Sequence, residues 1–461
     1  MTRFWGDWQT IASIVGGRAV GDGGKIPVTG ISTDTRTLRP GDLFFAIQGE
    51  NTDGHRFLAE ACQKQAAAAV VRWEHPALET APDALPRIET ADPLAAIQAL
   101  ARHHRRQFSL PVVAVTGSSG KTTTKDMTAA VLAEKWHVLS SQGSFNNELG
   151  VPLTLLALDE SHEAAVLEMG MRGLGQIRDL CGLAEPDIGI ITNVGVAHLG
   201  LLGTRENIFQ AKGELAEAIP PEGSCILNGD DDWTPGLRAR CRGRCYTFGL
   251  SPDQDLWAQD VVEENTTVRF TAVTLGQKVR VSLSCPGRHN VYNALSAMLA
   301  GLVLGMPLEA CAAGVEKTRL QEKRHGSWVG KKGSRILDDS YNANPESMEA
   351  SLRVLSHQAG RRIAVLGDMR ELGAIEEDAH RQVGCRVHQL GIEVLVTVGE
   401  LGAHIARGAR DAGHPQVFSY ADGSEAAEDL ERRLQAGDVV LVKGSRVMRM
   451  EEIAERLKEK D

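Results

Sequence analysis

The pattern of hydrophobic and polar positions divides the middle of the chain into a strand, a turn and a helix. The valine-rich run PVVAV at 111–115 ends in the small-residue turn GSSG at 117–120. After this turn, Met127, Val131 and Leu132 recur at the spacing of one helix face. A short apolar run is consistent with a buried strand, and a period near 3.6 residues is typical of a helix. The pattern therefore predicts a strand, a glycine-containing loop and a helix in this order.

The last third of the chain alternates between short apolar runs and amphipathic segments. Strands are expected at 335–338, 363–367, 393–398 and 438–442, and helices at 345–358, 378–390, 402–412 and 424–435. Strands that alternate with helices are typical of βαβ units around a parallel sheet. We therefore expect a Rossmann-like sheet here. No G-x-G-x-x-G sequence opens its first strand-to-helix turn, so we do not expect it to bind NAD.

Other segments complete a plan of three domains. The pattern predicts a short strand at 43–47, helices at 92–108 and 205–219, and a β-rich stretch at 255–285. A chain of 461 residues is too long for one core and suggests about three domains. We expect an α/β protein with domains at 1–88, 89–316 and 317–461.

Composition and charge exclude several classes of function. The chain has 42% hydrophobic and 24% charged residues, an ordinary soluble profile. Its net charge of −10 and its 5% of aromatic residues offer nucleic acid neither a basic face nor stacking rings. The N-terminal stretch lacks the form of a signal peptide, and no run of about 18 apolar residues predicts a membrane span. We therefore expect a cytoplasmic protein, and nothing in the composition demands an obligate partner, so we expect a monomer.

The eight cysteines are scattered along the chain. The one close pair, Cys241 and Cys245, has three residues between its members and no second pair at the spacing of a zinc site. We therefore expect free thiols, as is usual in a reducing compartment.

The segment at 111–126 carries the first candidate chemistry. A strand, a glycine loop, Lys-Thr and a helix follow one another in a phosphate-binding loop, where backbone N–H groups and the helix N-terminus attract phosphate oxygens. In such a loop Lys121 meets the β- and γ-phosphates, and the Thr122 hydroxyl binds Mg²⁺. The strict pattern has a glycine where this chain has Val115, so the loop is a variant that begins at Gly117. Gly-Lys-Thr also occurs by chance in loops, but the flanking strand and helix favour a nucleotide site.

Two further predicted strands end in side chains that suit a ligand site. Glu168 ends the run at 166–168, and His198 follows the run at 187–196. Ligands bind outside the carboxyl ends of strands in open parallel sheets, so these residues and the phosphate loop are expected to converge. Glu168 suits Mg²⁺ because this ion prefers hard oxygen ligands, although it could instead cap the next turn. His198 is a weaker candidate, because nitrogen is a second-choice ligand for Mg²⁺.

Some polar residues allow two interpretations. Ser32, Asp34 and Arg36 either meet a ligand or lie in a solvated loop, and the residues alone favour the loop. Lys212 lies on the helix expected at 205–219, where its pattern predicts an exposed side chain on a solvated face. Asn290 shares a helix face with Asn293, and the two either bracket a base or sugar or cap the helix start.

Seven sequence motifs follow one another over nearly the whole chain. They are TGSSGKTTTK (116–125), NNELGVPLTLL (146–156), LEMG (167–170), ITNVGVAHL (191–199), AKGE (211–214), GRHNVYNA (287–294) and DDSYNANPESM (338–348). Together they resemble the Mur ligases, the ATP-dependent amide-forming enzymes of peptidoglycan synthesis, whose phosphate loop has the same departure from the strict pattern. The resemblance implies a small N-terminal α/β uridine-binding domain, a central P-loop-type mononucleotide-binding sheet and a C-terminal Rossmann-like domain that binds the incoming amine substrate.

Two motifs narrow the resemblance within the family. VLGDMRELG (365–373) and VKGSRVMRMEE (442–452) are similar to the member that adds D-alanyl-D-alanine to UDP-N-acetylmuramoyl-tripeptide. The member that adds diaminopimelate or lysine shares the STDTR…PGDLFFAIQG region, but its Asp-Asn-Pro-Arg motif is absent here, and the nearest string is Asn344-Pro345-Glu346. The resemblance implies ATP and Mg²⁺ as cofactors, these two substrates as partners, and an acyl-phosphate route. The alternatives are the third-residue ligase, a folylpolyglutamate synthetase and a P-loop ATPase switch.

The resemblance also implies roles for single residues around ATP and Mg²⁺. Those that would wrap the phosphates are Gly117, Ser118, Ser119, Gly120, Lys121, Thr122 and Thr123. Thr122 and Glu168 would hold one Mg²⁺, and His198 a second. Lys212 matches a lysine that is carbamylated in much of the family, and a carbamate, unlike an ammonium, is an oxygen ligand for Mg²⁺.

The remaining roles implied by the resemblance concern the nucleotide and the other substrates. The residues that would face the nucleotide are Asn290, Arg324 and Asp339. Ser32, Asp34 and Arg36 would belong to the uridine-binding domain. Asn146 and Asn147 would contact the muramoyl substrate, and Asn342 and Asn344 the incoming dipeptide.

Overall fold

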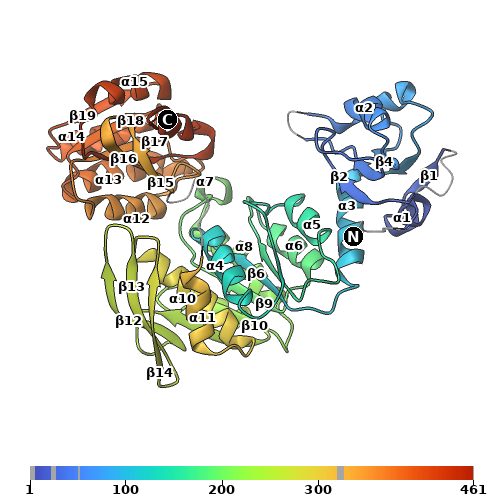
Figure 1. Cartoon of the computed structure of the whole chain (residues 1–461), viewed down its shortest axis with the longest axis horizontal. Coiled ribbons are helices and arrows are strands. Elements are labelled where there is room, and N and C mark those ends of the chain that lie inside the picture. Colours follow the sequence, from blue (N-terminus) through green and yellow to red (C-terminus); the bar gives the residue numbers. More distant parts are fainter. Residues whose placement is uncertain (1–5, 22–26, 50–51, 319–325, 460–461) are drawn as a thin grey trace. The chain divides into compact units, whose positions relative to one another are not determined.

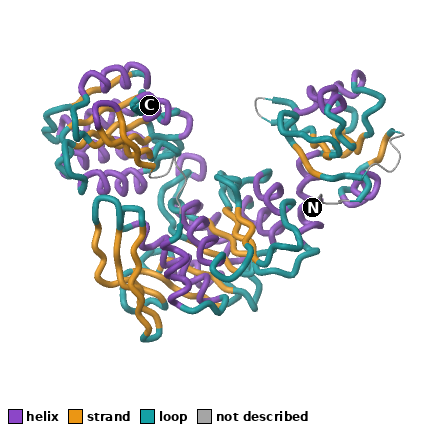
Figure 2. Tube along the Cα trace, viewed as in Figure 1, coloured by secondary structure: helices purple, strands orange, loops and turns teal. Residues whose placement is uncertain are grey.

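The computed structural model describes residues 6–21, 27–49, 52–318 and 326–459. The chain divides into two compact units (Figures 1 and 2). The first comprises Met1–Leu110, Ser144–His162 and Asp179–Glu185, and the second comprises Pro111–Gly143, Glu163–Arg178 and Pro186–Asp461. Three sheets lie in succession along the described chain, one in the first unit and two in the second. The expected α/β class is confirmed.

The first unit is built on a five-stranded sheet in the order β1-β5-β4-β3-β2. Its strands are β1 (Arg18–Val20), β2 (Gly30–Ser32), β3 (Asp42–Phe45), β4 (Ala68–Arg72) and β5 (Arg87–Thr90). Only β1 pairs antiparallel among these strands. The helices are α1 (Trp8–Ile14), α2 (Leu58–Gln63), α3 (Pro93–Arg105) and α5 (Gly150–Leu155). The helix expected at 92–108 is therefore α3, with Asp92 as its N-cap.

The second unit opens with a nine-stranded sheet in the order β14-β13-β12-β11-β10-β9-β6-β8-β7. Its parallel strands are β6 (Val112–Thr116), β7 (Val138–Ser140), β8 (Ala164–Glu168), β9 (Ile188–Ile191), β10 (Ser224–Asn228) and β11 (Arg244–Gly249). An antiparallel extension follows, made of β12 (Leu256–Glu263), β13 (Val268–Thr274) and β14 (Gln277–Leu283). The β-rich stretch expected at 255–285 is this extension.

Helices accompany the nine-stranded sheet. They are α4 (Lys121–Leu132), α6 (Gln176–Ala184), α7 (Leu199–Leu202), α8 (Arg205–Ala218), α9 (Thr234–Arg240), α10 (His289–Val303) and α11 (Leu308–Glu316). The segment α6 crosses from the second unit into the first. The phosphate-loop helix α4 packs against α10 and α11. Met127, Val131 and Leu132 of α4 are buried in the core of this sheet, as the helical spacing predicts.

The C-terminal sheet has the order β15-β16-β20-β17-β18-β19. Its strands are β15 (Gly326–Gly330), β16 (Ser334–Asp338), β17 (Arg362–Gly367), β18 (Val394–Val398), β19 (Val417–Tyr420) and β20 (Val439–Lys443). The helices are α12 (Pro345–Ser356), α13 (Glu376–Gln389), α14 (Gly402–Asp411), α15 (Gly423–Arg433) and α16 (Glu451–Arg456). The Rossmann-like arrangement is confirmed. The sequence analysis missed β19 and the antiparallel edge strand β15.

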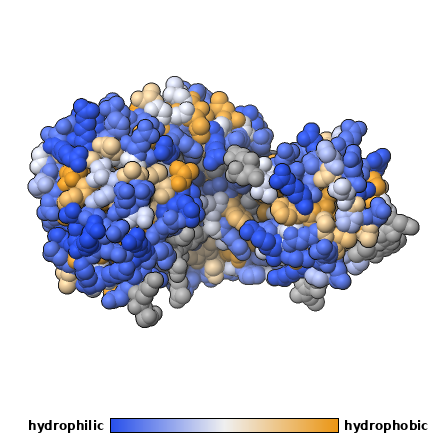
Figure 3. Space-filling view, turned by 90° about the horizontal axis from the view of Figure 1, so that it is seen from above, coloured by the Kyte–Doolittle hydropathy of each residue, from blue (hydrophilic) through white to orange (hydrophobic). Residues whose placement is uncertain are grey.

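Hydrophilic residues predominate on the face drawn in Figure 3, and hydrophobic residues form small groups among them. Within the described ranges, no helix combines the length and apolar character needed to cross a bilayer.

Candidate nucleotide-binding and catalytic site

The candidate site is built around the turn between β6 and α4. Two glycines in this turn have positive φ, at 152° for Gly117 and 78° for Gly120. A Cβ atom at Gly117 would collide with the Thr192 hydroxyl, and one at Gly120 would lie 2.5 Å from Asn293 Oδ1. The close approach of these neighbours, together with the backbone conformation, requires glycine at both positions.

The end of β9 holds the phosphate loop in shape. Asn193 accepts hydrogen bonds from the backbone N–H of Ser118 on its carbonyl at 3.1 Å and from that of Ser119 on Oδ1 at 3.0 Å. The Thr192 hydroxyl donates to the Ser119 carbonyl at 2.6 Å. The loop is therefore pre-organised by two residues that the sequence analysis quoted within a motif but gave no role. Their position directly after a predicted strand could have indicated this role.

Lys121 and Thr122 open helix α4, directly after Gly120. The Lys121 ammonium donates to the Gly117 carbonyl at 2.8 Å and so closes the loop on itself. The Thr122 hydroxyl donates to Glu168 Oε2 at 2.6 Å, and both of these side chains are buried. A hydroxyl beside a carboxylate is a pair of hard oxygen donors, the kind that Mg²⁺ prefers. These residues fit a magnesium ion at the phosphate loop.

Lys212 is buried on helix α8, with 1% of its surface exposed. The exposed position predicted from the helical pattern is therefore wrong. Burial lowers the pKa of the Lys212 amine well below its usual value, and the positive charge of Lys121 acts in the same direction. The negative charge of Glu346 opposes these effects. A buried lysine with a lowered pKa carries a neutral amine more readily than a surface lysine does.

Glu346 comes from the first turn of α12 and is a residue that the sequence analysis gave no role. Its Oε1 atom accepts a hydrogen bond from the Val196 backbone N–H at 2.8 Å. Its Oε2 atom is buried and has no hydrogen-bond partner among the described residues. This carboxylate therefore lies beside the loop that follows β9 and contributes negative charge near Lys212.

His198 has the left-handed backbone conformation, with φ of 66°, at the N-cap of α7. Its Nδ1 atom lies 2.5 Å from Glu371 Oε2, in the VLGDMRELG segment. This contact with the imidazole lowers the pKa of the Glu371 carboxyl group. The backbones of the two segments are also linked, because the Gly200 N–H donates a hydrogen bond to the Glu371 carbonyl at 2.7 Å. His198 therefore has a carboxylate partner in this structure, and its role toward a metal stays a prediction.

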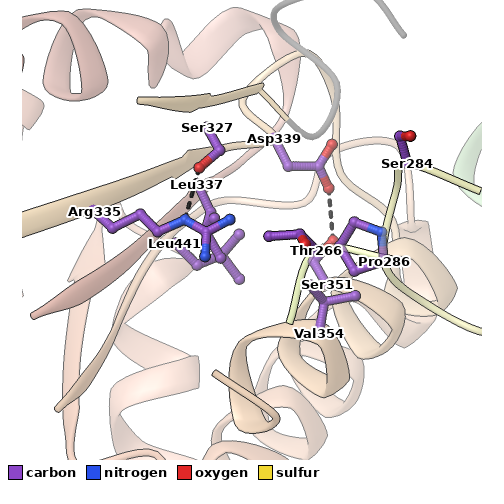
Figure 4. A pocket seen from close by; sticks show the side chains of 10 residues that line it. All are labelled: Thr266, Ser284, Pro286, Ser327, Arg335, Leu337, Asp339, Ser351, Val354 and Leu441. Atoms are coloured by element: carbon purple, nitrogen blue, oxygen red, sulfur yellow. Dashed lines mark hydrogen bonds between the residues drawn. The ribbon is translucent and has the colours of Figure 1, made fainter. Parts of the chain in front are cut away.

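Asp339 lines a pocket between the antiparallel extension and the C-terminal sheet (Figure 4). The residues around this pocket are Thr266, Ser284, Pro286, Ser327, Arg335, Leu337, Asp339, Ser351, Val354 and Leu441. The Pro286 carbonyl accepts a hydrogen bond from the Asn290 side-chain amide at 2.8 Å. Asn290 also accepts from Asn293, whose Oδ1 in turn accepts from Thr124 on helix α4. A chain of hydrogen bonds thus runs from the phosphate-loop helix to the wall of the Asp339 pocket.

The buried cation Lys443 accounts for much of the local environment of Asp339. Its ammonium donates to Asp339 Oδ2 at 2.5 Å and to the Asn342 carbonyl at 3.0 Å, and Ser351 donates to the same carboxylate at 2.6 Å.

Asn344 is the N-cap of α12 and accepts from the Ser347 N–H at 2.8 Å. Asn342 and Asn344 therefore have structural contacts, and their roles toward a dipeptide stay predictions. Arg324 lies outside the described residues.

The candidate substrate residues of the first unit are locally paired. Ser32 ends β2 and donates to the Asp34 carbonyl at 2.9 Å. Arg36 makes a two-pronged contact with Asp34 at 3.0 and 2.6 Å, which lowers the pKa of that carboxyl group. Asn147 is exposed and accepts from the Gly150 N–H at 2.9 Å, whereas Asn146 is half-buried. Their roles in substrate binding stay predictions.

The chain was compared with known protein families. Three descriptions match the chain in succession: "Mur ligase family, catalytic domain" at 27–105, "Mur ligase middle domain" at 115–301 and "Mur ligase, glutamate ligase domain" at 324–446. The chain belongs to the Mur ligase family. The expectation drawn from the seven motifs is confirmed, as is the three-domain plan. The exact boundaries near residues 88 and 316 stay predictions.

Individual Mur ligases resemble the chain over almost its full length. The UDP-N-acetylmuramoyl-tripeptide–D-alanyl-D-alanine ligase of Bacillus subtilis is 36% identical over 433 residues, which cover 93% of each chain. A crystal structure of MurF from Acinetobacter baumannii aligns with a TM-score of 0.89 and 31% identity, over 99% of this chain and 100% of that one. A MurF ligase from Thermotoga maritima, solved in complex with ADP, aligns with a TM-score of 0.81 and 28% identity, over 93% and 96%.

Proposed function

We propose that this Mur ligase joins D-alanyl-D-alanine to UDP-N-acetylmuramoyl-tripeptide and converts ATP to ADP and phosphate. The observation that carries the proposal is the similarity to a ligase of that name over 93% of the chain, together with a phosphate loop held by Asn193 and followed by the Thr122–Glu168 hydrogen bond. Because ATP and UDP-linked precursors are cytoplasmic metabolites, we place the reaction in the cytoplasm, and we expect the enzyme to act as a monomer.

The reaction has to overcome the poor reactivity of a carboxylate toward an amine. Hydroxide is a poor leaving group, so the tripeptide carboxylate first takes the γ-phosphoryl group of ATP and becomes an acyl phosphate. The dipeptide amine then attacks the acyl carbon, and phosphate leaves. Two anions meet in the first step, so pre-organised positive charge is the main source of rate acceleration.

The chain supplies several parts of this electrostatic environment. Lys121 would turn its ammonium from the Gly117 carbonyl to the β- and γ-phosphates, and the backbone N–H groups of the loop would bind their oxygens. Thr122 and Glu168 would hold Mg²⁺, which neutralises charge between these phosphates when bound. His198 would bind a second ion.

The buried amine of Lys212 suits the carbamate that the family resemblance implies. Carbon dioxide reacts with a neutral amine and not with an ammonium, and burial lowers the pKa of Lys212. The product is an anionic oxygen donor, which would complement a magnesium ion in this region. The negative charge would also relieve the repulsion between Lys212 and Lys121.

The remaining substrates are assigned to residues outside the phosphate loop. We propose that the uridine nucleotide contacts the region of Ser32, Asp34 and Arg36, and that Asn146 and Asn147 contact the muramoyl group. The dipeptide is assigned to the segment of Asn342 and Asn344, at the start of α12. The nucleoside of ATP would enter the pocket that Asp339 lines.

ADP and phosphate release tests the proposed function directly. The purified enzyme is mixed with ATP, Mg²⁺ and UDP-N-acetylmuramoyl-tripeptide, with either D-alanyl-D-alanine or a single amino acid as acceptor. We expect release that depends on the dipeptide. Release with a diamino acid on the dipeptide precursor would instead identify the ligase that adds the third residue. Release without any acceptor would contradict the ligase function and favour an ATPase switch.

A further inference from the structure

Three cysteines lie near one another at the amino ends of β10 and β11, two interior strands of the nine-stranded sheet. Cys225 and Cys245 are direct neighbours in the parallel pair β10–β11, so their side chains lie on the same face of the sheet. Cys241 is the C-cap of α9, which leads into β11. Cys241 and Cys245 are close in sequence, whereas Cys225 comes near them only through the pairing of β10 with β11. Its place in this group could therefore not be predicted from sequence spacing.

The three thiols interact with one another. The Cys225 and Cys245 thiols and the backbone N–H groups of Gly243 and Cys225 are close enough to the Cys241 thiol to stabilise its charged form. These contacts lower the pKa of Cys241, whereas the pKa values of Cys225 and Cys245 are raised. Cys225 is fully buried, and Cys241 and Cys245 are half-buried. One thiol of the group is therefore favoured as a thiolate and is reachable from solvent.

The surrounding charge is positive. The sequence RARCRGRC over 238–245 places four arginines within three residues of the two half-buried cysteines along the chain. Arg240 is engaged with Glu217 and Gln210 on α8, but no ion pair of Arg242 or Arg244 is found among the described residues. A thiolate is stabilised by neighbouring guanidinium groups and reacts readily when it is partly exposed. The same positive charge disfavours a divalent metal ion at these thiols.

We propose that Cys225, Cys241 and Cys245 form a peroxide-sensitive modification site, at which Cys241 is oxidised and then closes a disulfide with one of the other two cysteines. The Cys241 thiolate attacks hydrogen peroxide, which gives a sulfenic acid and releases hydroxide. A neighbouring thiol then attacks the sulfenic sulfur, the S–S bond forms and water leaves. Overall, one peroxide takes two electrons from two thiols and yields two waters.

This site is separate from the nucleotide site. Ser224 begins β10 and Arg244 begins β11, so Cys225 and Cys245 lie at the amino ends of these strands. The phosphate loop follows the carboxyl end of β6, which runs parallel to β9 and, through it, to β10. The two sites thus lie at opposite ends of the parallel strands, the thiols at the amino ends and the phosphate loop at the carboxyl ends.

Oxidation of the full-length, reduced protein tests the proposal. The protein is treated with a small excess of hydrogen peroxide and then with an alkylating agent, and its peptides are mapped by mass spectrometry. We expect a disulfide from Cys241 to Cys225 or Cys245. Cys385 is the internal control, because it is also half-buried but donates to the Gly408 carbonyl at 3.3 Å, and no neighbouring thiol is found among the residues that the structure describes. We expect Cys241 to lose its thiol at least about tenfold faster than Cys385, because a thiolate is far more reactive than a thiol.

Matched variants complete the test. Cys241→Ser should abolish the disulfide, whereas Cys385→Ser should leave its rate unchanged. Because the comparison of Cys241 with Cys385 is made within the wild-type chain, it stands even if a variant folds poorly. Equal reaction rates of Cys241 and Cys385, or a disulfide that persists in Cys241→Ser, would overturn the proposal. A tightly bound Zn²⁺ ion that blocks the three thiols in the purified protein would overturn it too and identify a metal site.

Discussion

The hydrogen bond between Thr122 and Glu168 offers a sharp test of the phosphate-loop site. Substituting Thr122→Val keeps the shape of the side chain but removes the hydroxyl that donates to the buried carboxylate at 2.6 Å. A hydrogen bond to a charged group contributes about 1.5–3 kcal/mol to stability. We therefore expect the variant to lose about that much free energy of unfolding.

The same helix provides a matched control. Thr128 lies on α4 and is fully buried like Thr122, but its hydroxyl has no hydrogen-bond partner among the described residues. Replacing it by valine removes an unsatisfied buried polar group, whose burial costs about 1–3 kcal/mol. Thr128→Val should therefore be neutral or stabilising. The same substitution on one helix is thus expected to lower the free energy of unfolding at Thr122 and to leave it unchanged or raise it at Thr128.

Denaturant unfolding and turnover are measured on both variants. Turnover of Thr122→Val should fall by about 10²–10³, the usual cost of one pre-organised electrostatic group, because the hydroxyl is a proposed Mg²⁺ ligand. Thr128→Val should keep wild-type turnover. Equal changes of stability in the two variants would refute the hydrogen bond, and wild-type turnover in Thr122→Val would refute the proposed role at the phosphates.

Other substitutions test the remaining parts of the site. Lys121→Ala should lower ADP release by at least about 10² while leaving the thermal unfolding curve unchanged; an active, folded variant would contradict its role. Lys212→Met should stabilise the protein, and this gain should shrink as the pH rises toward 10.5 in bicarbonate-free denaturation experiments. Since its folded pKa is lowered from 10.5, the wild-type unfolded chain binds the extra proton and wild-type stability rises with pH; a constant gain would refute this. Asp339→Ala should cost about 3–5 kcal/mol of unfolding free energy, because it leaves Lys443 buried without its carboxylate; a smaller loss would refute the pairing.

Patterns local in sequence predicted much of this protein. The turn at 117–120, helix α4 and the strand that ends in Glu168 follow from runs of adjacent residues, because burial of a strand or helix face leaves its period in the sequence. The C-terminal strands are found within one or two residues of their expected bounds for the same reason. The strand β19 has three partly buried residues and one exposed residue in VFSY, so its pattern is weaker and it was missed.

Contacts between distant segments could not be predicted in this way. Asn193 reaches the phosphate loop across 74 residues of sequence, and Glu346 reaches Val196 across 150. The burial of Lys212 was misjudged for a related reason. One apolar stripe predicts one buried face, but on α8 every residue from Ile208 to Ala216 except Gln210 is buried, because neighbouring elements cover the helix on more than one side.

Asp339 and Asn344 are candidate substrate contacts that also stabilise the fold. The interpretation of their variants has to separate these two roles. Asp339 neutralises Lys443, and Asn344 caps α12, so a substitution at either residue weakens the fold before any substrate is considered. A lost N-cap alone costs about 1 kcal/mol. Lower turnover in such a variant therefore does not establish a contact with nucleotide or dipeptide. A change in KM for one substrate, at a temperature where the variant is fully folded, isolates the binding role, because lost stability reduces the amount of active enzyme and leaves KM unaltered.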